Sequence, residues 1–181
     1  MRKIKDVPYD EVVAFFEKEH PIDDSSPHFA GNYWAMKHLE WANDAVDGVW
    51  SLCELEVEDI LGIVFAYHTA EETELCLVDE EGMTLAQTIE YIQANEEMYA
   101  QVHPVCWTKM MYWQGEDFTP VLLSTKPTPD KGKRSNVDQS LGNLFHQDGL
   151  HRLTRWGLDG RFDPETYASG PKLTAFISGK F

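Results

Sequence analysis

The longest apolar run in the chain, ILGIVFAY, spans residues 60–67. Eight residues have the length of a buried β-strand and are far too short to cross a bilayer as a helix. Such a strand needs a core around it, and 181 residues can bury one without metal or disulfide support. The composition is 43% apolar and 25% charged, as in globular proteins. We therefore expect a single domain over residues 1–181.

The start of the chain and its cysteines predict the cellular location of the protein. MRKIKDVPYDE is basic, but no apolar stretch follows it, so we expect no secretory signal. The three cysteines, Cys53, Cys76 and Cys106, are odd in number and show no CxxC spacing. We interpret them as reduced core residues and not as a disulfide or zinc framework. Both features predict a cytoplasmic protein.

The net charge of −16 belongs entirely to the first half of the chain. Residues 1–90 carry 21 acidic and 5 basic side chains, whereas residues 91–181 carry ten of each. A strong negative field repels nucleic acid and anionic membranes and attracts basic partners. We expect a protein partner at the acidic N-terminal half, without direct nucleic-acid or membrane contact. A solvated face that only promotes solubility is the alternative.

Hydrophobic periodicity and turn signals predict an alternation of helices and strands. The expected helices span residues 8–19, 32–46, 84–99 and 137–147. Asp6 is expected to cap the first of them, and the third opens on the capping box of Thr84 and Gln87. The expected strands span residues 49–56, 60–67, 73–78, 105–113, 118–125, 151–156 and 172–178. The first two strands should form a hairpin, because only three residues separate them. A polar loop, KPTPDKGKRSN, occupies residues 126–136. This order predicts an α+β fold with a largely antiparallel mixed sheet flanked by helices.

Two stretches of the chain resemble the GNAT acyltransferase fold. CLVDEEGMTLAQTIEYI, residues 76–92, has the layout of that family's strand, loop and long helix, in which loop amides bind the pyrophosphate of acetyl-CoA. LFHQDGL, residues 144–150, matches the spacing of an LYxxxGF-like pattern in which a helix ends and a strand follows. The resemblance covers about residues 60–156 and implies a GNAT-like sheet. An ordinary left-handed helix end at Gly149 explains the second stretch equally well.

The resemblance implies a site where the strand before residue 79 meets the helix that starts at Thr84. The expected cofactor-binding residues are Val78, Gly82, Met83 and Thr84, and the candidate catalytic residues are His68 and Glu74. A nearby carboxylate raises the pKa of an imidazole, so His68 would act as a general base. A solvated strand end is the alternative at His68.

This loop departs from the family pattern, which has Gln or Arg followed by glycines. It offers Gly82 together with three carboxylates, Asp79, Glu80 and Glu81. Each carboxylate beside a pyrophosphate would cost on the order of 1 to 3 kcal/mol. The family's tyrosine general acid falls at Phe145, which cannot donate a proton. We therefore expect a degraded acetyl-CoA site and no cofactor.

The function expected from these features is that of an acyltransferase-like domain acting mainly as an interaction or structural protein. Acyltransferase-like proteins of tailed phages are an example, and a host cytoplasm or a virion would then be the location. One alternative is an active N-acyltransferase that uses acyl-CoA. Another is an acidic decoy that occupies a basic site on a nucleic-acid enzyme. Contact between the basic loop and the acidic half of a second copy would give a homo-oligomer.

Two short segments combine histidines with carboxylates. They are HPIDDSSPH, residues 20–28, and HQDGLH, residues 146–151. Neither matches a known metal-ligand spacing, and an acidic chain brings such residues together by chance. The sequence therefore predicts surface or loop histidines and no metal site.

Overall fold

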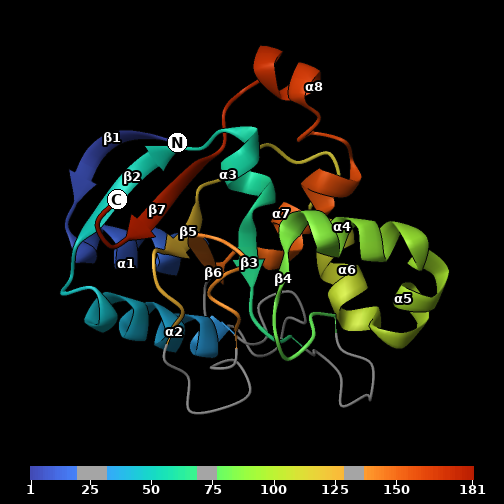
Figure 1. Ribbon diagram of the computed structural model, residues 1–181, viewed down its shortest axis with the longest axis horizontal. Helices are drawn as coiled ribbons and strands as arrows, with labels where there is room; N and C mark the ends of the chain where they lie inside the picture. Colours follow the sequence, from blue (N-terminus) through green and yellow to red (C-terminus); the bar gives the residue numbers. More distant parts are fainter. Residues whose placement is uncertain (20–31, 69–76, 129–136) are drawn as a thin grey trace.

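The computed structural model describes residues 1–19, 32–68, 77–128 and 137–181 (Figure 1). This part of the chain has an α+β fold, as expected, with a seven-stranded mixed sheet. The strands are β1 (Arg2–Val7), β2 (Trp50–Glu54), β3 (Ile63–Phe65), β4 (Met83–Thr84), β5 (Val121–Ser124), β6 (Leu144–Asp148) and β7 (Thr174–Ser178). The helices are α1 (Tyr9–Glu19), α2 (Asn32–Ala45), α3 (Val57–Leu61), α4 (Leu85–Ala94), α5 (Glu96–Val102), α6 (Pro104–Tyr112), α7 (Leu150–Leu158) and α8 (Pro164–Ser169).

The strands follow the order β1-β2-β7-β5-β6-β3-β4 across the sheet. Neighbours are antiparallel except for two parallel pairs, β5 with β7 and β3 with β6. The prediction of a largely antiparallel mixed sheet is therefore confirmed. Because β3 and β6 are parallel, the carboxyl ends of both strands reach the same edge of the sheet.

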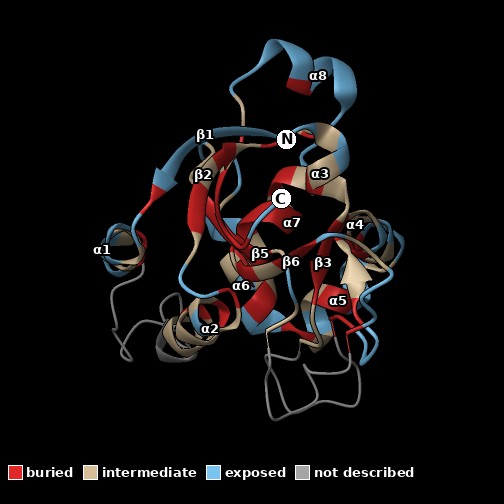
Figure 2. Cartoon of the chain, turned by 60° about the vertical axis from the view of Figure 1, so that its left-hand side comes forward, coloured by how far each residue is buried: buried red, intermediate tan, exposed pale blue. Residues whose placement is uncertain are grey.

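Side chains of successive strand residues point to opposite faces of the sheet, and both faces are covered. Val121 and Leu123 of β5 pack with α4, α6 and α7 on one face. Leu122 packs with α1 and α2 on the other face (Figure 1). Buried residues gather in the central strands, whereas β1 and α8 are largely exposed (Figure 2). None of the described helices is long and apolar enough to cross a membrane.

Several elements confirm the expectations from sequence. α1, α2, β2, β5 and β7 lie within the predicted ranges 8–19, 32–46, 49–56, 118–125 and 172–178. The capping box at the start of α4 is also present. The Thr84 side chain accepts the Gln87 N–H, and the Gln87 side chain accepts the Thr84 N–H. Cys53 and Cys106 are buried and are not joined in a disulfide, as predicted.

The start of the chain differs from the prediction. Residues 2–7 form β1, an edge strand that the sequence analysis missed. Asp6 belongs to this strand and does not cap α1. Its carboxylate pairs with Lys3 and accepts a hydrogen bond from the Ser51 hydroxyl at 3.4 Å.

The predicted hairpin of residues 49–56 and 60–67 is wrong. Residues between the two runs form α3, and the Asp59 side chain accepts the Glu56 N–H at 2.9 Å at its start. The extended backbone ends after β2, and α3 continues to Leu61. Of the strand predicted at 60–67, only the three residues of β3 are extended in the sheet. β2 pairs with β1 and β7, whereas β3 pairs with β4 and β6.

Four further predictions, beyond residue 83, differ from the structure. Residues 105–113, predicted as a strand, lie mainly in α6, and the helix predicted at 84–99 is divided into α4 and α5. Residues 137–147 were predicted as a helix but contain β6, and the strand predicted at 151–156 lies in α7. LFHQDGL is therefore a strand followed by a helix, the reverse of the order that the resemblance implies. Most of the strand predicted at 73–78 lies outside the described residues, as does most of the polar loop.

Candidate metal centre and adjoining pocket

The parallel strands β3 and β6 deliver two histidine-bearing segments to one edge of the sheet. Beyond β3 the chain reaches His68, which forms an antiparallel bridge with Val78. Beyond β6 the chain passes Gly149 and enters α7, whose second residue is His151. The region outside the carboxyl ends of parallel strands is where α/β sheets commonly bind ligands.

Gly149 makes the sharp corner between β6 and α7. Its φ of 109° is in the left-handed region that favours glycine. A Cβ atom at this position would lie 2.8 Å from Cγ1 of Val121 and 2.9 Å from Nε of Arg152. Both the backbone conformation and the close packing therefore require glycine. The corner fixes where the first turn of α7 begins.

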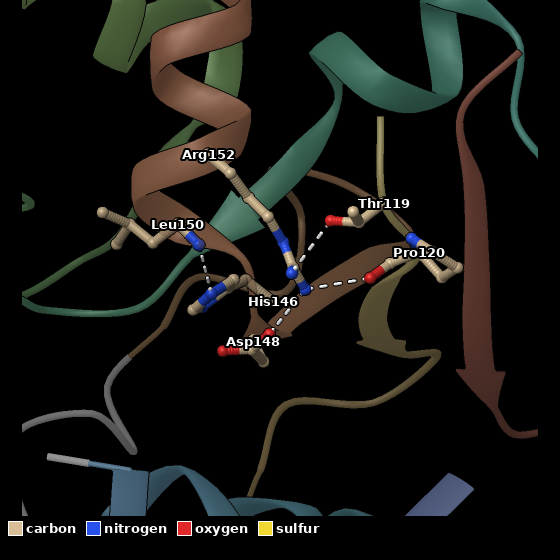
Figure 3. Close-up of polar contacts among 6 residues, drawn as sticks. All are labelled: Thr119, Pro120, His146, Asp148, Leu150 and Arg152. Carbon is tan, nitrogen blue, oxygen red and sulfur yellow. Dashed lines mark hydrogen bonds and ion pairs between the residues drawn. The ribbon is translucent and has the colours of Figure 1, made fainter. Parts of the chain in front are cut away.

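His146 of β6 caps this helix. Its Nε2 atom accepts the backbone N–H of Leu150 at 2.9 Å (Figure 3). That amide is one of the first-turn donors that have no partner within a helix. An accepting Nε2 carries no proton, so the neutral ring holds its proton on Nδ1. The side chain of His146 is thus tied to the helix that carries His151.

Arg152 is buried beneath the same corner, with a side chain that is 1% exposed (Figure 3). One terminal nitrogen donates to the carboxylate of Asp148 at 2.6 Å and to the carbonyl of Pro120 at 2.9 Å. The other donates to the hydroxyl of Thr119 at 3.2 Å. Burial lowers the pKa of Arg152, and the charges of Asp148 and Glu19 oppose this effect. These bonds tie the end of β6 and the start of α7 to the segment before β5.

His68, Cys106 and His151 form the candidate metal centre. Each side chain offers one ligand atom, and these atoms all lie within 4.8 Å of one another. Nε2 of His68 is 3.3 Å from Sγ of Cys106, and the ring centroids of the two histidines are 5.6 Å apart. Tetrahedral zinc, with bonds of about 2.0 to 2.3 Å, separates a nitrogen and a sulfur ligand by roughly 3.6 Å. The separation of the His68 and Cys106 ligand atoms is close to this value, and the other two separations are at most 4.8 Å.

The chemistry of the three donors also suits a transition metal. Cys106 is fully buried and lies in the first turn of α6, where the helix dipole favours a thiolate. Thiolate and imidazole are the usual protein ligands of zinc. At Cys53, burial raises the pKa of the thiol to about 11 and so keeps the thiol neutral.

A pocket of about 510 Å³, counted to its open mouth, adjoins the centre. His68 belongs both to the candidate metal centre and to the lining of this pocket. The apolar lining residues are Val64, Ala66, Pro127, Val137, Phe145 and Leu150, and the other polar ones are His38, Tyr67, Thr128, His146 and Gln147.

The structure places the predicted site residues unevenly. His68, expected as a general base, lies in the candidate metal centre, and Val78 is its backbone partner. Phe145 lines the adjoining pocket together with His68. Glu74 lies outside the described residues. The sequence analysis interpreted Cys106 as a core cysteine and His151 as a surface or loop histidine, because the three ligands come from separate segments and match no local motif.

The loop of residues 79–83 corresponds to the acetyl-CoA site in the GNAT resemblance. Its backbone amides form hydrogen bonds within the chain. The N–H of Glu81 donates to the Asp79 side chain at 3.2 Å, and the N–H of Gly82 donates to the Asp79 carbonyl at 3.2 Å. The N–H of Thr84 donates to the Gln87 side chain. Met83 and Thr84 form β4 against β3. These amides are engaged within the chain and do not form an open cradle.

Taken together, the fold and the site define an α+β protein with a candidate His–Cys–His metal centre beside a pocket. The chain belongs to DUF6309, a family of unknown function, which matches it over residues 1–181. No curated protein and no solved structure matches the chain.

Proposed function

We propose that the protein is a metal-dependent enzyme in which His68, Cys106 and His151 hold one zinc-class divalent ion. The observation that carries this proposal is the convergence of three ligand atoms, from three separate segments, within 4.8 Å. Catalytic zinc sites use three protein ligands and leave one position for water or substrate. The described residues supply this number.

The chemistry proposed is hydrolysis or a related reaction at a carbonyl group. A bound zinc-class ion lowers the pKa of a coordinated water to about 7 and polarises a carbonyl oxygen. His68 connects the ion to the pocket, because its side chain belongs to both. The bonds at the β6–α7 corner hold His151 in place.

A cysteine nucleophile is the competing use of the same residues, since His68 lies within reach of the Cys106 sulfur. A nucleophile must touch the substrate, however. Cys106 is 0% exposed and is not among the described residues that line the pocket. Its position favours a metal ligand over a nucleophile.

Metal content and cobalt spectroscopy test this proposal. We expect the purified protein to contain close to one zinc-class ion per chain. Its cobalt-substituted form should show thiolate-to-metal charge-transfer absorption. Cys106→Ser should abolish that band, whereas Cys53→Ser, a change at another buried free cysteine, should retain it. Added azide should alter the cobalt bands, because a catalytic ion has an exchangeable position. Absence of stoichiometric metal, or a charge-transfer band that persists in Cys106→Ser, would overturn the proposal.

A second proposal keeps the resemblance to acyltransferases: a GNAT-like domain whose acetyl-CoA site is degraded. The internal bonds of the amides of Glu81, Gly82 and Thr84 favour it, because amides with partners in the chain are poor donors to a pyrophosphate. We expect millimolar acetyl-CoA to leave the melting temperature unchanged. A ligand at 100 times its dissociation constant would stabilise the protein by about 2.7 kcal/mol, so a clear rise in melting temperature would contradict this proposal.

A further inference from the structure

The described residues that line the pocket include no Asp, Glu, Lys or Arg. These residue types make up 25% of the chain as a whole. A charged group taken from water into such surroundings loses its hydration without gaining an ion-pair partner. The described walls therefore select against a ligand that carries a charge on the part lying in the pocket.

One wall of the pocket is an apolar surface of the sheet. Val64 of β3 is paired with Phe145 of β6, and both pack with Val137 in one small cluster. These side chains lie next to each other and are almost fully buried, so the wall of the pocket that they form is apolar. Such a surface binds by removing apolar area from water.

The polar groups of Thr128 and Gln147 are largely satisfied by the chain itself. The Thr128 hydroxyl donates to the side-chain oxygen of Gln147, and the Gln147 amide donates to the Phe145 carbonyl at 3.4 Å. These groups impose no need for an ionic partner. The ion itself would be the main polar anchor, since two neutral imidazoles and one thiolate leave a divalent ion with a net positive charge.

We infer that the pocket binds a small molecule with an uncharged apolar body and one oxygen donor, such as a carbonyl, that reaches the ion held by His68, Cys106 and His151. This inference rests on the proposed metal function. It deepens that function, because it names the class of substrate: a neutral apolar amide or ester, in place of a phosphate or a polycarboxylate.

Three hydroxamic acids that share one metal-binding group test the inference on the cobalt-substituted protein. Acetohydroxamate has almost no body, benzohydroxamate has an apolar body, and 4-carboxybenzohydroxamate has the same body with a charge. We expect benzohydroxamate to bind at least tenfold more tightly than acetohydroxamate, as judged by titration of the cobalt bands. The added carboxylate should remove that gain. Inorganic phosphate should bind more weakly than any of the three.

A variant of the apolar wall gives a second measurement. Phe145→Leu should weaken benzohydroxamate several-fold and leave acetohydroxamate unchanged. Phe118→Leu is the matched control, because Phe118 packs on Trp156 and Phe162 and is not among the described lining residues. It should leave both ligands unaffected.

The outcomes separate the two proposals. A protein that takes up no cobalt through Cys106 refutes the metal function itself. A protein that binds cobalt as expected, but prefers the carboxylated ligand or phosphate, or does not distinguish benzohydroxamate from acetohydroxamate, leaves the metal function standing and refutes the inferred substrate class.

Discussion

The guanidinium group of Arg152 lies 2.6 Å from the carboxylate of Asp148, and the pair spans the corner where β6 turns into α7. A second pair with the same spacing, Arg155 with Asp159, lies further along α7. The first pair is reinforced by bonds to Thr119 and Pro120, and its arginine is 1% exposed, whereas the arginine of the second pair is 12% exposed. The two pairs therefore allow a comparison of a fully buried and a partly buried arginine on one helix.

Replacing Arg152 by Met keeps an unbranched side chain but removes the charge. Asp148 then loses its ion pair with the buried guanidinium, and breaking a buried pair from one side typically costs about 3 to 5 kcal/mol. We expect a loss of that order in the free energy of unfolding, measured by urea denaturation. Arg155→Met, the matched control, should lose less, because the arginine of this pair is less completely buried and the Thr119 and Pro120 bonds are absent from it. Equal losses in the two variants would show that burial of the first pair has no energetic consequence.

Gly149→Ala tests the corner itself. Alanine must adopt a left-handed backbone and fit a Cβ atom against Val121 and Arg152, so we expect a loss of about 2 to 4 kcal/mol in the free energy of unfolding. Gly160→Ala shares the positive φ, but its Cβ would meet nothing within 4 Å. This control should lose only about 1 to 2 kcal/mol. The difference between the two variants measures the close packing, and no difference would contradict it.

Removal of metal should destabilise the protein. An ion that binds only the folded chain adds about 2.7 kcal/mol at 100 times its dissociation constant, so a chelator should lower the melting temperature by several degrees. Readdition of zinc should restore it. Cys106→Ser should be insensitive to the chelator, whereas Cys53→Ser should respond like the unaltered protein. A melting temperature that ignores both chelator and zinc would argue against a bound ion.

The stability of the protein should fall at alkaline pH because of Cys53. Burial raises the pKa of its thiol from 9.0 to about 11. Above about pH 9 the unfolded chain loses this proton while the folded chain keeps it. The stabilisation by the neutral thiol is complete below about pH 9 and is lost as the pH rises toward 11, by on the order of 2 kcal/mol. Cys53→Ala should flatten this part of the pH profile of unfolding, and an unchanged slope would contradict the assignment.

The sequence predicted those elements whose signals are local. α1 and α4 have amphipathic periods with nearby turn or capping residues, and β7 is a short run of β-branched and apolar residues. α6 was predicted as a strand because its large apolar residues occupy both faces of an alternating pattern. In the structure Met110 is buried while Tyr112 is 57% exposed, as expected for a helix packed on one side. Pro104 at its first turn was the signal for a helix start.

α7 also carried a signal that was not used. Leu150, Leu153 and Trp156 recur every three residues and are all buried. The candidate metal centre is a different case, since the sequence separations of His68, Cys106 and His151 match no metal-ligand motif. Their proximity results from the parallel pairing of β3 with β6 and from the packing of α6 on α7, and neither of these contacts is encoded in a local pattern.

The edge strand β1 has a practical consequence. It carries Arg2, Lys3 and Lys5, and lysines on an edge strand discourage pairing with another sheet. The strand behind it, β2, is mostly buried and has few charges. Deleting residues 1–7 would expose the largely apolar edge of β2, so we expect the shortened protein to self-associate.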